Sequence, residues 1–193
     1  GAMSVQNLLI TPLARGLVKG AVMMSGGGDI SALNSPTVPQ RVIPIWEKIK
    51  EGFQVRSLRE LQGVPAASIY GAWQSALEDL PQYAAYPVVD GDVLPMNVDE
   101  ALDRGAVANV PCIIGVLSED MWPYSLYKAA LDYGVRRSRV EGNAPVYTYY
   151  FDRKLPGENR FGAFHGGDLW YVMGTLERNW RPFDAIDRRI SEN

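Results

Sequence analysis

The sequence predicts an α/β fold with a mostly parallel sheet flanked by helices. Three short, nearly all-apolar runs are typical of buried strands, at residues 18–24, 110–116 and 145–151. Segments with apolar residues at helical spacing separate these runs. Strands that alternate with helices favour parallel pairing, with helices on both faces of the sheet. No internal repeat is visible along the chain.

Each element follows from a local pattern. The first helix has Val5, Leu8, Leu9 and Leu13 at helical spacing, and the strand after it stops at Ser25, where three glycines permit a tight turn. The predicted helices share such an apolar stripe and cover residues 4–14, 38–53, 65–79, 98–104, 122–139 and 182–190. A shorter helix is expected from Ser57, and Asn97 should cap the helix at 98–104. The segment after His165 is expected to return to helix, through Leu169, Val172, Met173 and Leu176. Residues 87–95 predict a turn between two short extended pieces.

The bulk composition limits the class of protein. A chain of 193 residues suits one domain or a piece of a larger one, and its 47% hydrophobic and 21% charged residues argue against disorder. A net charge of −3 with scattered lysines and arginines offers no basic surface for nucleic acid or anionic membranes. With no apolar run long enough to span a bilayer and no signal-peptide pattern, we expect a soluble, cytoplasmic protein.

Cysteine and histidine are each present once, which limits metal chemistry. Cys112 is the sole cysteine, so no intrachain disulfide can form, and its position in a strand predicts a small buried core residue. With one histidine and one cysteine, the chain has too few of the usual ligands for a zinc site. We therefore expect neither a metal nor a cofactor.

His165 is the only histidine, so any acid–base mechanism through imidazole must use it. It lies between glycines, although a structural or solvent-exposed loop histidine is the alternative. Two acids, Glu119 and Asp120, follow the apolar run at 110–116, where open α/β sheets usually bind ligands. Asp120 could instead cap the helix that follows.

Five motifs occur here in one order along the chain: Ser25-Gly26-Gly27, residues 87–91, Ser118-Glu119-Asp120, residues 146–151 and Gly162-Ala163-Phe164-His165. That order resembles the C-terminal half of the type-B carboxylesterase family of α/β-hydrolases, over nearly the whole chain. The resemblance implies a partial α/β-hydrolase fold without its early strands. Residues 1–193 would then form the C-terminal part of a single domain, as a fragment of an esterase.

The resemblance also implies the chemistry of a carboxylic ester hydrolase acting on a small-molecule ester. His165 matches the triad histidine, and Asp120 matches the position that glutamate usually holds as the orienting acid, with Glu119 as the alternative. The chain order serine, acid, histidine is that of α/β-hydrolases. The imidazole would deprotonate a serine hydroxyl, while the acid fixes the ring tautomer.

The nucleophile is expected to lie outside this sequence. Residues 1–5 resemble those after the serine in the family's Gly-x-Ser-Ala-Gly motif, which would place the serine two positions before Gly1. Alternatively, the first three residues are the remnant of a tag. Ser25 is a weak substitute, because bulky Met23 would clash in the sharp turn of a nucleophile elbow. Without the serine and the oxyanion loop, the chain alone should be inactive.

The main alternative is a catalytically inactive α/β-hydrolase that serves as a binding or assembly module. Retention of both His165 and an acid favours enzyme ancestry. Loss of early strands would expose an apolar sheet edge, so we expect pairing with a separate N-terminal polypeptide or with a second copy. Among the aromatic residues, Phe164 and Trp170 are the best candidates to touch substrate, whereas core packing explains most of the others.

Overall fold

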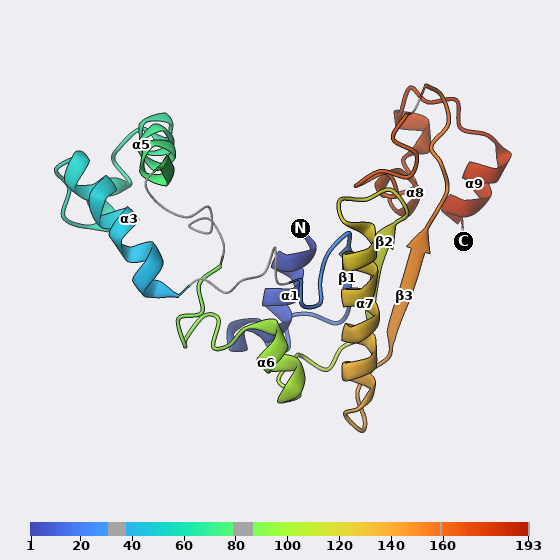
Figure 1. The fold of residues 1–193 in the computed structure, drawn as a ribbon, viewed down its shortest axis with the longest axis horizontal. Helices are drawn as coiled ribbons and strands as arrows, with labels where there is room; N and C mark the ends of the chain where they lie inside the picture. The colour runs from blue at the N-terminus through green and yellow to red at the C-terminus, as the bar shows by residue number, and fades with distance from the viewer. Residues whose placement is uncertain (31–37, 79–86, 159, 193) are drawn as a thin grey trace. The chain divides into compact units, whose positions relative to one another are not determined.

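A computed structural model describes residues 1–30, 38–78, 87–158 and 160–192. The chain divides into two compact units, residues 1–30 with 98–193 and residues 31–97. Figure 1 shows a sheet with helices in the first unit and a group of helices in the second. That residues 1–193 belong to one hydrolase domain stays a prediction.

The sheet of the first unit has three parallel strands in the order β1-β2-β3 (Figure 1). They are β1 (Ala21–Met24), β2 (Cys112–Leu117) and β3 (Val146–Phe151). Their register pairs Ala21 with Cys112, and Cys112 in turn with Val146. The three strands overlap the three predicted apolar runs but begin one to three residues later, and their pairing confirms the predicted parallel α/β arrangement.

The helices of the first unit lie mostly where apolar periodicity predicts them. They are α1 (Ala2–Ile10), α6 (Val98–Asp103), α7 (Pro123–Ser138), α8 (Leu169–Val172) and α9 (Ala185–Glu192), with 3-10 turns η1 (Pro12–Ala14) and η3 (Leu176–Arg178). The predicted first helix stops early because Thr11, which precedes a proline, is extended, and its hydroxyl accepts the N–H of Leu13.

Two helices near the C-terminus are shorter than predicted. The helix after His165 lasts a single turn, and the chain then reaches Gly174 in the left-handed conformation that ends many helices. The last helix begins at Ala185 rather than at Pro182. The Asp184 carboxyl group accepts the N–H groups of Ile186 and Asp187, so it caps that helix in the way aspartate does at many N-termini.

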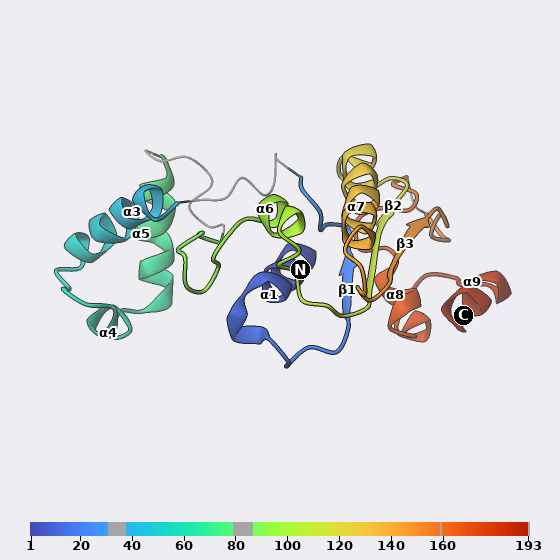
Figure 2. The same cartoon turned by 90° about the horizontal axis from the view of Figure 1, so that it is seen from below.

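One face of the sheet packs against α7, which runs alongside the strands in both views (Figures 1 and 2). Met23 and Ile114 point to this face and are fully buried. Gly134 of α7 faces Thr148 and Val146 of β3. The buried side chains of α7 that complete this core are Leu126, Ala129, Ala130 and Tyr133.

The opposite face is covered only toward the carboxyl ends of the strands. There Leu117 is fully buried, and the ring of Phe151 lies 5.0 Å from that of Tyr171. Toward the amino ends, Val22, Ile113 and Tyr147 pair across the three strands and are 45%, 43% and 61% exposed. Among the described residues, the second face of the sheet is therefore only partly covered, whereas cover on both faces was expected. We call Val22, Ile113 and Tyr147 the exposed row.

The second unit contains three helices among its described residues: α3 (Pro39–Gly52), α4 (Leu58–Leu61) and α5 (Ala66–Glu78). They match the predicted helices, except that Asp79 lies outside the described residues. The hydroxyl of Ser57 accepts the Glu60 N–H and starts α4 as expected. The core of this unit is apolar and consists of Ile45, Ile49, Leu61 and Ala76.

The chain after β1 turns at Gly28, which packs directly on α7. Gly28 has a φ of +75°, and a Cβ there would overlap the backbone carbonyl of Ala129. Its N–H donates to the Oε1 atom of Gln6 at 2.6 Å, and Gln6 is itself buried. This contact ties α1 to the turn after β1.

We expect Gly28→Ala to lower the free energy of unfolding by about 2 kcal/mol or more, because both the backbone conformation and the contact with α7 reject a methyl group. The measurement is urea unfolding followed by near-UV circular dichroism. Gly134→Ala is the matched control, since its nearest neighbour would be at an ordinary 3.7 Å. That substitution should stabilise α7 by about 0.5–1 kcal/mol. Equal stabilities for the two variants would contradict the packing described.

Candidate active site

Asp120 lies in the turn that follows β2, and its side chain is fully buried. Its Oδ1 atom accepts the N–H of Met121 at 2.7 Å, whereas Oδ2 has no partner among the described residues. Helix α7 begins only at Pro123, with Trp122 at its N-cap in a left-handed conformation. The alternative that Asp120 caps this helix is therefore not supported by the geometry.

The loop that carries His165 runs beside the end of β2. The Glu119 N–H donates to the carbonyl of Ala163 at 3.2 Å, and Glu119 forms an isolated parallel bridge with Phe164. Gly162 has a φ of +60°, and a Cβ there would overlap the Glu119 carboxyl group. The glycine thus lets the loop approach the strand closely.

His165 and Asp120 lie in direct contact. The Nδ1 atom of His165 is 2.7 Å from Asp120 Oδ1, across 45 positions of sequence. An ionised carboxylate only accepts hydrogen bonds, so this geometry places the ring hydrogen of the neutral imidazole on Nδ1. The imidazole is half exposed, which leaves its other nitrogen, Nε2, for a different partner. The structure thus pairs the imidazole with Asp120 rather than with Glu119, whose side chain is exposed.

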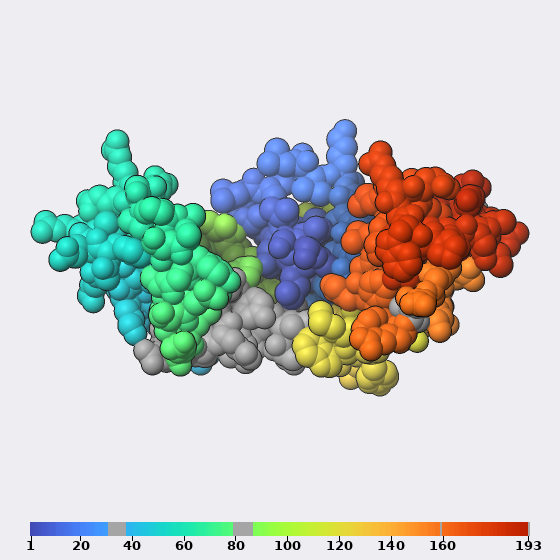
Figure 3. Space-filling view, turned by 90° about the horizontal axis from the view of Figure 1, so that it is seen from above, coloured from blue at the N-terminus to red at the C-terminus, as the bar shows by residue number. Residues whose placement is uncertain are grey.

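A cavity of about 310 Å³ opens beside the imidazole. Its lining comes from the start of α1, from β1 with Ser25, and from the loop at 165–169. Figure 3 shows α1 in dark blue and the C-terminal segment in red on the same side of the first unit. Gly1, just before α1, and Ala2 and Val5 of that helix thus border the same space as His165.

Ser25 borders this cavity without pairing with the imidazole. It directly follows β1 and has a φ of 56°, and its N–H donates to the Gly115 carbonyl at 2.9 Å. Its Oγ atom is buried and has no hydrogen-bond partner among the described residues. A serine activated by His165 would share a hydrogen bond with it, so the geometry favours a structural role for Ser25.

Sequence reasoning missed Asp168, which also borders the cavity and is 1% exposed. Its Oδ2 atom accepts the Tyr149 hydroxyl at 2.6 Å, and its Oδ1 atom has no partner in the described part of the chain. Burial raises the pKa of Asp168, and the Tyr149 hydrogen bond opposes that increase. The only available signal was its position three residues after His165.

The aromatic pair expected to touch substrate lies elsewhere. Phe164 and Trp170 pack edge to face with their ring centres 6.3 Å apart, and Arg181 lies over Phe164 at 5.7 Å. Neither ring belongs to the lining of the His165 cavity. Cys112 is buried as predicted, and burial raises the pKa of its thiol.

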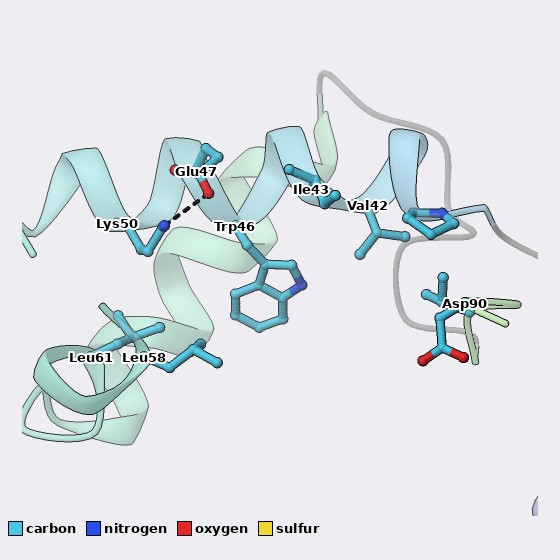
Figure 4. Close-up of a pocket in the computed structure, with 10 residues that line it drawn as sticks. Val42, Ile43, Trp46, Glu47, Lys50, Leu58, Leu61 and Asp90 are labelled. Carbon is cyan, nitrogen blue, oxygen red and sulfur yellow. Dashed lines mark ion pairs between the residues drawn. The ribbon is translucent and has the colours of Figure 1, made fainter. Parts of the chain in front are cut away.

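A second, apolar cavity of about 540 Å³ lies within the second unit (Figure 4). Its lining includes Trp46 and Leu58, with charged groups on Glu47, Lys50 and Asp90. Lys50 pairs with Glu47 at 2.8 Å, and the cavity lining contains no serine, cysteine or histidine. Acid–base chemistry through imidazole therefore belongs to the first cavity.

Residues 1–130 match the model of the carboxylesterase family. The chain belongs to the carboxylesterase family. It is 24% identical to Gut esterase 1 of Caenorhabditis briggsae over 205 residues, which cover 97% of this chain and 35% of that protein. It is also 24% identical to the para-nitrobenzyl esterase of Bacillus subtilis over 230 residues, with 92% and 45% covered. The chain thus spans less than half the length of these curated relatives.

Solved structures establish the fold of this carboxylesterase-family chain. A PNB esterase aligns with a TM-score of 0.77 and 17% identity, over 100% of this chain and 50% of that one. The juvenile hormone esterase of Manduca sexta aligns with a TM-score of 0.69 and 19% identity, over 99% and 52%. Both confirm the partial α/β-hydrolase fold.

Within residues 1–30, 38–78, 87–158 and 160–192, no three histidine, cysteine or acidic side chains gather in a way that could hold a metal ion. In the same ranges, no helix combines the length and apolar character needed to cross a membrane.

We expect Asp120→Asn to abolish the preference of the His165 imidazole for hydrogen at Nδ1, because an amide side chain can donate a hydrogen bond as well as accept one. Since His165 is the only histidine, the ¹⁵N chemical shifts of its ring report this directly. Glu119→Gln is the matched control and should leave the shifts unchanged. A spectrum that responds to Glu119→Gln and not to Asp120→Asn would contradict the pairing.

Proposed function

We propose that this chain supplies the base and the orienting acid of a serine ester hydrolase. The observation that carries the proposal is the His165–Asp120 hydrogen bond of 2.7 Å beside an open cavity. An imidazole held by a carboxyl group through Nδ1, with Nε2 left available, has the geometry of a catalytic triad. Membership of the carboxylesterase family supports the same reaction class.

In this proposal, Nε2 of His165 removes the proton of a serine hydroxyl as the serine oxygen attacks the acyl carbon of an ester. The resulting imidazolium keeps its hydrogen bond to Asp120, which stabilises the positive charge. The imidazolium then gives the proton to the leaving alkoxide, and an acyl-serine remains. Water repeats the two proton transfers and releases the carboxylic acid, so the serine and imidazole are regenerated.

We propose further that the nucleophile is a serine two positions before Gly1. In α/β-hydrolases, the nucleophile lies on a sharp turn that leads from a strand into a helix. Support comes from α1, which begins at Ala2 and borders the His165 cavity together with Gly1. A serine just before this helix would therefore lie close to the cavity that His165 borders.

The exposed row favours association with another polypeptide. Parallel sheets are normally covered on both faces, yet Val22, Ile113 and Tyr147 are each more than two-fifths exposed. We propose that a separate N-terminal polypeptide carrying the serine covers this row in the active assembly. A catalytically inactive binding module is the second candidate, and the same surface would serve it.

The test of catalysis mixes this chain with a second polypeptide, which is encoded directly upstream of Gly1 and ends with Gly-x-Ser-Ala. We call the mixture of the two polypeptides the pair. We expect the 193-residue chain alone to leave p-nitrophenyl esters uncleaved above background, and the pair to cleave them. In the pair, Asp120→Asn should lower kcat by about 10⁴-fold, because the imidazole then takes the wrong tautomer.

Ser25→Ala is the matched control and should leave the activity of the pair unchanged. Turnover by the isolated chain that Ser25→Ala abolishes would contradict the placement of the nucleophile. Absence of the Gly-x-Ser-Ala motif from the adjoining coding sequence would contradict it equally. An inactive pair with intact association would favour the binding module.

The test of association is light scattering coupled to size exclusion. We expect the isolated chain to form dimers or larger species at high concentration, because an exposed apolar row gains free energy when it is covered. Ile113→Lys, in the centre of the row, should reduce this association. Leu17→Lys is the control, since Leu17 is 79% exposed but lies outside the row. A chain that stays monomeric at high concentration would contradict self-association through this row, and an upstream polypeptide that binds the Ile113→Lys variant as well as the wild type would contradict the proposed cover.

A further inference from the structure

The loop that carries His165 is also attached to β3, in addition to its contacts with Glu119 and Asp120 after β2. Asp168 follows the histidine by three residues, and the Tyr149 hydroxyl of β3 donates to its Oδ2 atom at 2.6 Å. Asp168 is 1% exposed, so water does not compete for this hydrogen bond. The loop is thus held from two neighbouring strands, from β2 through Glu119 and Asp120 after its end, and from β3 through Tyr149.

The strand register explains why Tyr149 can reach Asp168. Gly115 of β2 is the direct neighbour of Tyr149 on β3. A Cβ at position 115 would overlap the Tyr149 ring, so the absence of a side chain lets that ring lie across the strand. The face that carries this ring is opposite to the face covered by α7. The hydroxyl is thereby directed to the loop at 165–168.

The groups around Asp168 act on its pKa in opposite directions. Burial raises the pKa of Asp168, and the neighbouring Asp120 raises it further, whereas Tyr149 and His165 lower it. Tyr149 in turn has its pKa raised by burial and by Asp168, so its hydroxyl keeps its hydrogen as a donor. The titratable groups that act on Asp168 are thus Tyr149, Asp120 and His165.

We propose that Asp168 is a positioning residue, which holds the His165 loop through the Tyr149 hydrogen bond so that the imidazole stays aligned with Asp120. The inference rests on the proposed function, because alignment of the imidazole matters only if His165 acts as a base. Asp168 acts through the loop and not on the substrate. Gly115 takes part by leaving room for the tyrosine ring.

The test measures the ¹⁵N chemical shifts of the single imidazole in the 193-residue chain. Tyr149→Phe and Asp168→Ala each remove the hydrogen bond and should reduce the population with hydrogen on Nδ1. Asp168→Asn keeps a carbonyl oxygen that accepts from the tyrosine, so it should restore the wild-type shifts. Asp132→Asn is the matched control, because Asp132 is a half-exposed residue of α7, on the other side of the sheet.

Wild-type shifts in both Tyr149→Phe and Asp168→Ala would overturn the proposal. An Asp168→Asn variant as perturbed as Asp168→Ala would also overturn it, since charge rather than the hydrogen bond would then matter. If Asp168→Ala does not fold, Tyr149→Phe alone decides, because it removes one oxygen and keeps the ring. Asp120→Asn distinguishes failure of the proposed function from failure of the positioning role of Asp168. Unchanged ¹⁵N shifts in Asp120→Asn would refute the proposed function, whatever Tyr149→Phe shows.

Discussion

Burial of the Asp120 carboxyl group at the end of β2 has a free-energy cost that its neighbours must offset. Its Oδ1 atom meets two partners, the Met121 N–H and the His165 ring, while Oδ2 has none among the described residues. The contact with His165 is therefore both a stabilising interaction and the core of the candidate site. It joins the turn after β2 to a loop that comes 45 positions later.

The parallel sheet makes this meeting possible. Its strands all run in one direction, so their carboxyl ends lie at the same edge, and the groups that follow them are close. Ser25 follows β1 and Asp120 follows β2, while the loop beside β2 brings His165 to the same edge. Helix α1 adds the start of its first turn to the cavity. The chemistry proposed for this chain thus depends on strand register more than on any one loop.

The same register also explains the surface that lacks cover. One face of the three strands packs under α7, and the other is closed only where residues after β3 return over it. Val22, Ile113 and Tyr147 remain exposed at the other end of that face. This row and the cavity bordered by Gly1 both favour the proposal that another polypeptide completes the sheet and the site.

Local patterns in the sequence determined the strands, the long helices and the one histidine on which a mechanism could depend. Apolar periodicity and turn residues act over a few positions, so those features can be predicted without coordinates. Helix ends were less predictable, because caps such as Asp184 depend on side-chain geometry. Only the tertiary structure shows that Asp120, and not the exposed Glu119, contacts the His165 imidazole, since the side chain of Asp120 is turned inward. It alone revealed Asp168, whose partner Tyr149 lies 19 positions away on a strand. Contacts between residues so distant in sequence are set by packing, which no local pattern encodes.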